Sequence, residues 1–504
     1  MPEFSTARTL PHIPDDVTVE QFILRDDHPA RPVRPQSSPW LVADGTGVEV
    51  SLQEIQERTI NLANGLHSRF GIGEDDVVLI FSGNHIEYPI CTWAVHRLCA
   101  IISPCNPSST VSELTNQLRQ TRATLVIAHA QLLDVALSGA REAGIPEERI
   151  LVIEEEDGAL HGRRSVAYLM KHGLDTSPIL GRKLHAGEGR RKIAFLCSSS
   201  GTTGKPKVVA ISHFAFIAQV LQLAIHSRDE THASWDEQRY RPGDTCLAVL
   251  PFYHIYGLVA SISLVLFSGM TVVVVPKFTF LGMLESIGRH KINHLMLVPP
   301  QVVLLCKESI VRNYDLSSVR VILCAAAPLS AELNEQLVNL FPDAHIGQAY
   351  GSTECTGGVS LWSTRSKRGF NGGQLLPEVV ARVVKPDGTL CGYNEPGELL
   401  VKTPCCRARI FWQRRGHEGN ICGRMDRLKE IIKVRGFQVA PAELEGCLLG
   451  HDMVADVCVV GMPESFSGEV PLAFVVPDKG CLVGIPERSE CNFTSQEIYH
   501  GVRG

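Results

Sequence analysis

A run of small hydroxylated residues and glycines, followed by two lysines, lies between Phe195 and His213 in the stretch FLCSSSGTTGKPKVVAISH. Glycine lets successive backbone N–H groups point toward one anion, and serine and threonine hydroxyls add further donors. Lys205 and Lys207 supply the positive charge that a triphosphate needs. The loop is not a Walker A motif, because Pro206 follows Lys205. A solvated linker has a similar composition, but it would not usually follow a buried strand directly, so the loop is predicted to bind phosphate.

A second candidate segment has the sequence GQAYGSTE at Gly347–Glu354. It is predicted to form a tight, glycine-bearing turn that presents Thr353 and Glu354 at one edge. A carboxylate beside a triphosphate is a hard oxygen ligand for Mg²⁺, and the neighbouring hydroxyl can donate to a phosphate or carboxylate oxygen. Such a turn alone would more often be structural. Beside a phosphate loop, it is predicted to be functional.

Two further segments follow apolar strands. Pro251–Gly257 (PFYHIYG) gathers three aromatic residues around His254, and Cys324–Leu329 (CAAAPL) offers small side chains on which a flat adenine ring could rest. A single histidine among aromatic residues is usually a core residue. Parallel sheets, however, bind ligands at the carboxyl ends of their strands, and His254 is therefore predicted to face a ligand.

The elements that must position these segments alternate between strand and helix from about residue 50 to 400. Apolar runs predict strands at Val77–Phe81, Ala100–Ser103, Leu125–Ala128, Ile150–Ile153, Cys246–Leu250, Thr271–Pro276, His294–Pro299 and Val319–Cys324. Helical periodicity lies between them, as at Leu52–Phe70 and Ser112–Gln120. This alternation indicates an α/β fold with doubly wound parallel sheets. The polar stretch Ser227–Asp244 is predicted to be an exposed loop.

The pattern changes near Met425, where DRLKEIIKVRGFQVAPAELEGCLL predicts a charged turn, a short strand and a helix beginning after Pro441. Proline suits the first turn of a helix, and Glu443 and Glu445 suit its positive end. We therefore expect a large N-terminal domain at residues 1–424 and a small, shortened, mobile α+β domain at residues 425–504.

Composition and charge narrow the class of protein. The 504 residues carry a net charge of -6 without a compensating basic tract, which argues against a nucleic-acid partner. The longest apolar runs are too short to cross a bilayer, and the first residues lack the layout of a secretory signal. The sixteen cysteines form no CxxC pair and are expected to be reduced core thiols rather than metal ligands. We expect a cytoplasmic monomer or weak homodimer; a peroxisomal location stays open, although the chain does not end in Ser-Lys-Leu.

Taken together, these segments resemble the adenylate-forming, or AMP-binding, superfamily. SSSGTTGKPK, PFYHIYG, GQAYGSTE, PGELLVKTP and DRLKEIIKVRGFQVAPAELE occur in the order found in 4-coumarate–CoA ligases and fungal acyl-CoA ligases, and the similarity runs from about Trp40 to Val476. The resemblance implies that ATP and a carboxylic acid give an acyl-adenylate and pyrophosphate, and that coenzyme A then displaces AMP. ATP, Mg²⁺ and coenzyme A are the implied cofactors, and secondary metabolism is the implied setting.

The resemblance also implies roles for matched positions. The phosphates of ATP would be held by Ser198, Ser199, Ser200, Gly201, Thr202, Thr203, Gly204, Lys205 and Lys207. Adenosine and its surroundings would involve Ala326, Gln348, Tyr350 and Arg427. The chemistry would use His254, Thr353, Lys433 and Gln438, with Glu354 for magnesium. The acyl group would meet His254, Tyr256, Val259, Leu323, Ala325, Gly351, Gly357, Gly358 and Val359. Coenzyme A would meet Arg435 and Gly436 after the small domain rotates.

Two departures from the family pattern are visible. Between Glu398 and Asp426 there is no Thr-Gly-Asp, whose aspartate holds the ribose hydroxyls in the family, and the gap is placed between Arg415 and Asn420. The tail after Val476 shows no counterpart of the family's adenylation lysine. Three interpretations follow: a working acyl-CoA ligase, a catalytically defective nucleotide- or acyl-binding relative, or an adenylation enzyme that loads a carrier protein.

The acid itself is predicted only by class. Val259 and Leu323 stand where plant coumarate ligases have polar residues, so a phenolic hydroxyl would find no buried partner. Gly357 and Gly358 are expected to enlarge the far end of the pocket. These positions favour an unhydroxylated aryl acid, such as benzoate or cinnamate, or a medium-chain fatty acid.

Overall fold

The computed structural model describes residues 3–6, 8–25, 27–154, 164–199, 207–228, 234, 238–327, 329, 331–363, 365–370, 372–393, 395, 397–405, 409–410, 432–434, 437–439, 444–445, 448–449, 451, 454–464 and 468–477. The chain divides into two compact units. The first comprises Met1–Ala326 and Val338–Arg424, and the second comprises Ala327–Leu337 and Met425–Gly504. The predicted extent of the two functional domains stays a prediction.

The helices of the described residues are α1 (Val19–Leu24), α2 (Leu52–Phe70), α3 (Glu87–Arg97), α4 (Val111–Thr121), α5 (Leu133–Ala143), α6 (Val166–Leu174), α7 (His213–Ser227), α8 (Val265–Phe267), α9 (Phe280–His290), α10 (Pro299–Lys307) and α11 (Ala331–Leu340). Local sequence explains their ends. In α2, the Ser51 side chain accepts a hydrogen bond from the N–H of Glu54, and Gly71 closes the helix in a left-handed conformation. A helical stripe including Ile55, Leu62 and Leu66 is buried.

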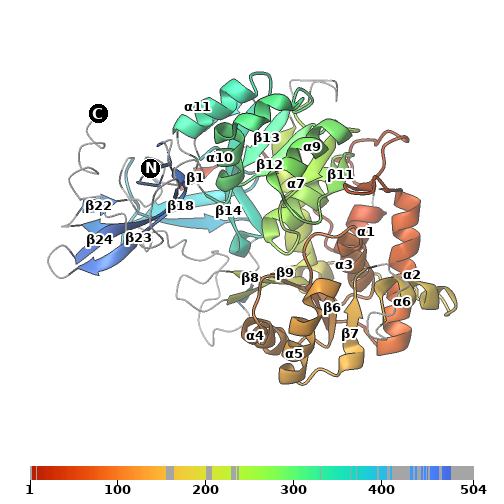
Figure 1. Cartoon of the computed structure of the whole chain (residues 1–504). Helices are drawn as coiled ribbons and strands as arrows, with labels where there is room; N and C mark the ends of the chain where they lie inside the picture. The colour runs from red at the N-terminus through yellow and green to blue at the C-terminus, as the bar shows by residue number, and fades with distance from the viewer. Residues whose placement is uncertain are drawn as a thin grey trace. The chain divides into compact units, whose positions relative to one another are not determined.

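One sheet of the first unit has seven strands in the order β20-β9-β8-β5-β4-β6-β7. They are β4 (Val77–Phe81), β5 (Ile101–Cys105), β6 (Leu125–Ala128), β7 (Ile150–Val152), β8 (Ile193–Ser199), β9 (Lys207–Ser212) and β20 (Arg409–Ile410). Strands β4 to β8 pair in parallel, whereas β9 pairs antiparallel with β8. Helices α4 and α5 lie side by side over this sheet (Figure 1), and apolar residues from both layers form a common core.

The second sheet of this unit has ten strands, nine of them in the order β17-β15-β14-β13-β12-β10-β11-β2-β3, with β16 beside β14. They are β2 (Leu41–Ala43), β3 (Glu49–Val50), β10 (Thr245–Ala248), β11 (Thr271–Val274), β12 (His294–Leu297), β13 (Val321–Cys324), β14 (His345–Ser352), β15 (Gly357–Leu361), β16 (Arg368–Gly369) and β17 (Gln374–Leu375). From β14 to β2 the strands are parallel. Their carboxyl ends therefore meet at one edge of the sheet.

Antiparallel pairing characterises the remaining strands. In the first unit, β1 (Glu3–Ser5), β18 (Val380–Val384) and β19 (Glu398–Lys402) form a three-stranded sheet. In the second unit, β21 (Ile432–Val434), β22 (Phe437–Val439), β23 (Val454–Glu464) and β24 (Gly468–Pro477) form a four-stranded sheet. The helix predicted after Pro441 begins outside the described residues.

The predicted elements agree closely with the observed ones. The ranges of β4, β6 and α2 match exactly, and the other predicted strands differ from the observed ones by one or two residues at one or both ends. The exposed loop predicted at Ser227–Asp244 is wrong in part, because Arg239 and Tyr240 are buried. The Arg239 guanidinium lies 3.9 Å from the centroid of the Trp362 ring and donates to the Ser363 carbonyl at 2.8 Å, which draws this segment into the core.

The described cysteines are all free thiols, and most are buried. Within the described part of the chain, no helix has both the length and the apolar character needed to cross a membrane.

Candidate active site

The phosphate-loop residues join two antiparallel strands. In the β8–β9 hairpin, Ser198 pairs with Val208 and Ser199 pairs with Lys207. Ser198 is exposed, Lys207 is partly exposed, and the buried hydroxyl of Ser199 has no hydrogen-bond partner among the described residues. Ser200 to Lys205 lie outside the described residues. The structure thus places both ends of the predicted loop close together, with a serine and a lysine directly across the hairpin.

The sequence predicts a tight turn over Gly347–Glu354, but only the end of this segment forms a turn. Its residues up to Ser352 extend β14, and the chain turns only in the short 3₁₀ helix Thr353–Cys355. The Ser352 hydroxyl accepts a hydrogen bond from the N–H of Cys355 at 3.3 Å and closes this turn. Strand pairing explains the difference, because β14 continues along β15 through Ser352.

Gly351 allows the close approach of β14 and β15. A Cβ atom at this position would collide with the Gly357 carbonyl oxygen. The turn after β14 also contacts β8, so the strand that leads into the phosphate loop lies beside Thr353 and Glu354. Both side chains are partly exposed. The structure therefore brings together two of the segments that sequence analysis selected.

PFYHIYG follows β10 at the carboxyl edge of the ten-stranded sheet. The His254 Nδ1 atom accepts a hydrogen bond from the N–H of Tyr256 at 3.2 Å, and surrounding protein lowers the imidazole pKa by desolvating its cation. The Tyr256 hydroxyl donates to the Leu323 carbonyl at 3.1 Å, and burial raises the pKa of Tyr256 well above its ordinary value. His254 is exposed, so it can meet a ligand as a neutral base or hydrogen-bond partner.

CAAAPL begins where β13 ends, beside the middle of β14. Cys324 pairs with Gln348 in the parallel register, and Gln348 and Tyr350 are partly exposed. Ala326 is exposed and has a φ of 76°, a left-handed conformation that alanine rarely adopts. Such backbone strain concentrates at ligand sites, which agrees with the predicted place of Ala326 near adenine.

The predicted acyl-group residues divide into buried and accessible sets. Val259, Leu323, Ala325 and Val359 are buried, whereas Tyr256, Gly351, Gly357 and Gly358 retain exposed surface. Val259 lies in an eight-residue π-helix, Gly257–Leu264, a rare conformation that is often found near functional sites.

The expected widening of the pocket by the two glycines is wrong. A Cβ atom on Gly357 would lie 3.5 Å from the Gln219 side chain, and one on Gly358 would lie 3.2 Å from Leu376 and 3.4 Å from Leu223. The Cβ positions of both glycines therefore lie against side chains of the core rather than in an open pocket.

The site residues predicted for the second unit are only partly described. Lys433 and Gln438 pair directly across the β21–β22 hairpin. Arg427, Arg435 and Gly436 lie outside the described residues, as do the segment Arg415–Asn420 and the tail from residue 478 onward. The roles proposed for all five residues stay predictions.

The residues at the β14 turn fit a magnesium ion that also binds phosphate. Magnesium in phosphate-transfer sites commonly has one or two protein carboxylates and takes its other ligands from water and phosphate oxygens. Glu354 supplies one partly exposed carboxylate beside β8. Within the described residues, no group of three or more acidic, histidine or cysteine side chains forms a metal site of its own.

Comparison with known proteins places this arrangement in a family. The model of the AMP-binding enzyme family matches residues 30–411, and that of the AMP-binding enzyme C-terminal domain matches residues 443–504. The chain belongs to the AMP-binding enzyme family. The resemblance to adenylate-forming enzymes noted from the motifs is thereby confirmed.

Curated relatives of this AMP-binding enzyme include acyl-CoA ligases. The acyl-CoA ligase easD of Emericella nidulans is 30% identical, over 94% of this chain and 89% of the relative. The 4-coumarate–CoA ligase 3 of Arabidopsis thaliana is 32% identical, over 88% of this chain and 80% of the relative. A crystal structure of the anthranilate CoA ligase AuaEII with anthranoyl-AMP covers 97% of this chain and 90% of its own, with a TM-score of 0.79 and 19% identity. This likeness confirms the predicted fold class.

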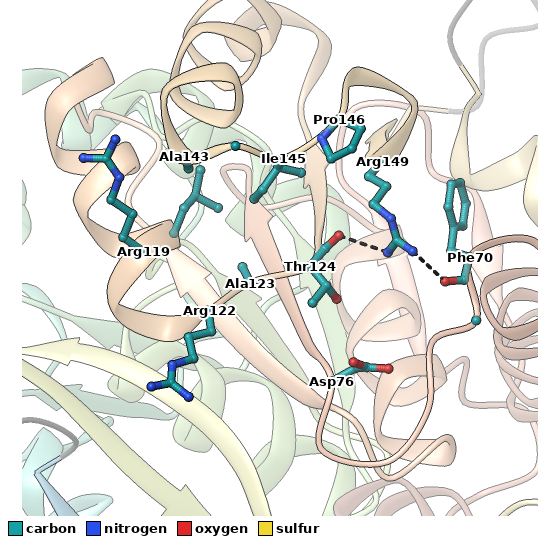
Figure 2. A pocket seen from close by; sticks show the side chains of 13 residues that line it. Phe70, Asp76, Arg119, Arg122, Ala123, Thr124, Ala143, Ile145, Pro146 and Arg149 are labelled. Atoms are coloured by element: carbon teal, nitrogen blue, oxygen red, sulfur yellow. Dashed lines mark hydrogen bonds between the residues drawn. The ribbon is translucent and has the colours of Figure 1, made fainter.

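A hollow of about 610 Å³ in this AMP-binding enzyme lies away from the predicted site, at the amino ends of β4, β6 and β7. None of its described lining residues is a predicted site residue. Figure 2 shows Arg149 reaching the Thr124 and Phe70 carbonyls, at 3.1 and 3.0 Å. Arg119 donates to the Glu142 carbonyl at 2.5 Å. Two of these three carbonyls lie at the C-terminal ends of helices. We therefore infer that Arg119 and Arg149 cap helix ends rather than bind a phosphate.

Sequence analysis missed one residue that supports PFYHIYG. Asn84 follows β4, and its amide donates to the Ala248 and Leu250 carbonyls at 3.2 and 2.9 Å. Its oxygen accepts from the N–H of Phe252 at 2.8 Å. The buried Asn84 thereby joins the two large sheets of the AMP-binding enzyme at the start of the motif. Its signal in the sequence was a polar residue just after a buried parallel strand.

Proposed function

We propose that this AMP-binding enzyme is an acyl-CoA ligase. A carboxylate oxygen of the acid attacks the α-phosphorus of ATP, and the bond to pyrophosphate breaks. The thiolate of coenzyme A then attacks the acyl carbon, and AMP leaves with the original carboxylate oxygen. The observation that carries the proposal is the contact between β8, which leads into the phosphate loop, and the turn that bears Thr353 and Glu354.

The first step requires stabilisation of negative charge on the phosphates. Lys207, across the hairpin from Ser199, supplies a positive charge. The Ser199 hydroxyl, which has no partner within the part of the chain that is described, supplies a donor. Thr353 donates to the phosphate or to the acid. When bound at Glu354, magnesium would neutralise part of the phosphate charge. The other residues between Ser198 and Lys207, most of which lie outside the described residues, are proposed to bind the phosphates as well.

The apolar part of the predicted acyl site supports an unhydroxylated aryl acid, or a medium-chain fatty acid. Val259 and Leu323 are apolar and buried, and the Tyr256 hydroxyl already donates its proton to a backbone carbonyl. A phenolic hydroxyl placed among these three side chains would lose water without gaining a donor from them. The solved relative that carries anthranoyl-AMP supports the aryl class.

The second step is assigned to the second unit. Lys433 and Gln438, paired across the β21–β22 hairpin, assist the chemistry. Arg435 and Gly436, which lie outside the described residues, meet coenzyme A. We also propose that the enzyme uses magnesium, acts in secondary metabolism and is located in the cytoplasm.

A second candidate function rests on one sequence observation. Between Glu398 and Asp426 the chain has no Thr-Gly-Asp. A catalytically defective relative would bind nucleotide or acyl-adenylate without turning it over. If the loss impairs adenylation more than thioester formation, a preformed acyl-adenylate supplied with coenzyme A should be converted faster, relative to intact ligases, than acid plus ATP.

The test is pyrophosphate release with benzoate, cinnamate, 4-coumarate and octanoate, each with and without coenzyme A. Acid-dependent pyrophosphate release together with a CoA thioester supports the ligase, and faster turnover of cinnamate than of 4-coumarate supports the assigned acid class. Pyrophosphate without any thioester indicates an enzyme that loads a carrier protein. No release with any acid, although MgATP binds, indicates the defective relative and overturns the ligase.

A further inference from the structure

Helix α7 carries two buried glutamines in an apolar sequence, FAFIAQVLQLAI. Gln219 and Gln222 are both fully buried and one helical turn apart. A buried amide is costly unless its donors and acceptor are paired. Helix α7 also contacts β8, β15 and the π-helix Gly257–Leu264, so it touches the elements that carry three of the predicted site segments.

Gln219 holds the turn after β14 from both sides. With its amide nitrogen directed toward the turn, it donates to the Cys355 carbonyl at 3.2 Å and to the Gly358 carbonyl at 3.0 Å. Between these residues the backbone takes positive φ angles twice, 61° at Thr356 and 131° at Gly357. Such a conformation is unfavourable for threonine and persists only where its surroundings hold it.

Gln222 belongs to a second group of bonds that reaches the same turn. Its amide donates to the Pro377 carbonyl at 2.6 Å and to the Thr403 hydroxyl at 3.0 Å, and its oxygen accepts from the Cys405 thiol at 2.9 Å. Burial raises the pKa of this thiol, which keeps the proton in place. The Thr356 hydroxyl then donates to the Cys405 carbonyl at 3.2 Å.

From this geometry we infer that Gln219 is a positioning residue for adenylation, acting through the turn that presents Thr353 and Glu354. Its two hydrogen bonds hold the carbonyls on either side of the left-handed backbone, and they thereby set the direction of Glu354 relative to β8. The inference rests on the proposed function, because it assumes that Thr353 and Glu354 meet MgATP. Gln219 itself needs no contact with substrate.

The experiment compares the full-length parent with Gln219→Met and Gln219→Glu. Methionine keeps the volume and removes both donors, whereas glutamate would place a carboxylate against two carbonyls. We measure MgATP binding by calorimetry, the magnesium concentration at half-maximal pyrophosphate release, and kcat and KM separately. Because a misdirected ligand weakens magnesium and nucleotide contacts, Gln219→Met is expected to raise the ATP dissociation constant and the magnesium requirement about tenfold, and Gln219→Glu by more.

Gln117→Met is the matched control. Gln117 is also a buried amide and donates to the Ser103 hydroxyl and the Pro104 carbonyl, both at 2.9 Å, in the seven-stranded sheet. The control should lose stability as Gln219→Met does, yet keep the parent's magnesium requirement. Folded Gln219→Met that binds MgATP and magnesium like the parent overturns the positioning role. If the proposed function is wrong, the parent itself will release no pyrophosphate. In that case, comparing MgATP binding by the parent and by Gln219→Met still tests the role of Gln219.

Discussion

Two groups of polar residues, at opposite edges of the parallel sheets in the first unit, are held in opposite ways. At the carboxyl edge, His254, Lys207 and Ser198 keep exposed surface, and the Ser199 hydroxyl has no partner among the described residues. At the amino edge, polar side chains bind one another. Asp244, which precedes β10, accepts from His294 at the start of β12 at 2.8 Å and from Arg320, which precedes β13.

The difference separates polar groups that serve the fold from polar groups that are available to a ligand. A buried, mutually paired group contributes to stability, and removing one member leaves the others uncompensated. A group with unused hydrogen-bonding capacity at a strand end costs little when it is removed, unless a ligand needs it. Stability and function in this AMP-binding enzyme should therefore respond to substitutions at opposite edges.

The largest expected effect is on stability at the amino edge. Asp244→Ala leaves His294 and the Arg320 guanidinium without their carboxylate, and we expect a loss of about 3 kcal/mol in the free energy of unfolding. Chemical denaturation measures this loss. Glu285→Ala, which removes an exposed partner of Arg289 3.8 Å away on the same helix, is the control and should cost less than about 1 kcal/mol. If both substitutions cost the same, the amino-edge network is not a stabilising one.

The next effect is on ATP binding at the carboxyl edge. Lys207→Ala removes a charged contact to phosphate, which should weaken MgATP binding by about 1.5–3 kcal/mol, roughly tenfold to a hundredfold, with little change in stability. Calorimetry gives the affinity. Arg122→Ala, at the hollow on the opposite edge, should leave the affinity unchanged. Equal affinities for the parent and Lys207→Ala would remove this lysine from the site.

Glu354→Gln should shift the magnesium titration of nucleotide binding. The substitution keeps the size and removes the charge, so half-saturation should need about tenfold more magnesium. Asp76→Asn, whose carboxylate accepts from the N–H of Gly73 at 2.9 Å near the amino edge, is the comparison variant. Superimposable titrations for Glu354→Gln and the parent would show that Glu354 is not a metal ligand.

The smallest expected effect concerns pH. Burial lowers the pKa of His345, at the start of β14, to about 4, and burial also lowers the pKa of His294 despite its bond to Asp244. Unfolded histidines titrate near pH 6.5, so the unfolded chain binds more protons between about pH 6.5 and 4, and stability falls as the pH falls through this window. His345→Gln should reduce this loss by about 1 kcal/mol. Urea unfolding at pH 7 and pH 5 tests it, and an unchanged difference would contradict it.

Local patterns were sufficient for much of the fold and for the choice of site segments. Apolar runs located β4 and β6, and the periodicity of α2 gave its exact ends. The glycine- and hydroxyl-rich loop and PFYHIYG were chosen because their chemistry is visible in a few consecutive residues. Hydrogen bonds between segments distant in sequence were not visible in this way, such as Gln219 with Cys355 or Asn84 with Phe252.

The same limit explains the errors. Glycines at 357 and 358 suggest open space when only neighbours in sequence are considered, but side chains of α7 and Leu376 lie against these positions. The extension of β14 through Ser352 depends on pairing with β15, which no local pattern around Gly351 reveals. Arg239 is charged and its surroundings are polar, yet the Trp362 ring draws it inside.

The β8–β9 hairpin has a consequence for the way in which this enzyme attracts its nucleotide. In many phosphate-binding loops a helix begins directly after the loop, and its dipole adds a fixed positive potential. Here β9 separates the loop from α7, which begins only at His213, and antiparallel strands contribute little net dipole. The attraction for the triphosphate must therefore come mainly from charged side chains and individual N–H donors. Screening by salt should weaken nucleotide capture more steeply here than where a helix terminus points at the phosphates.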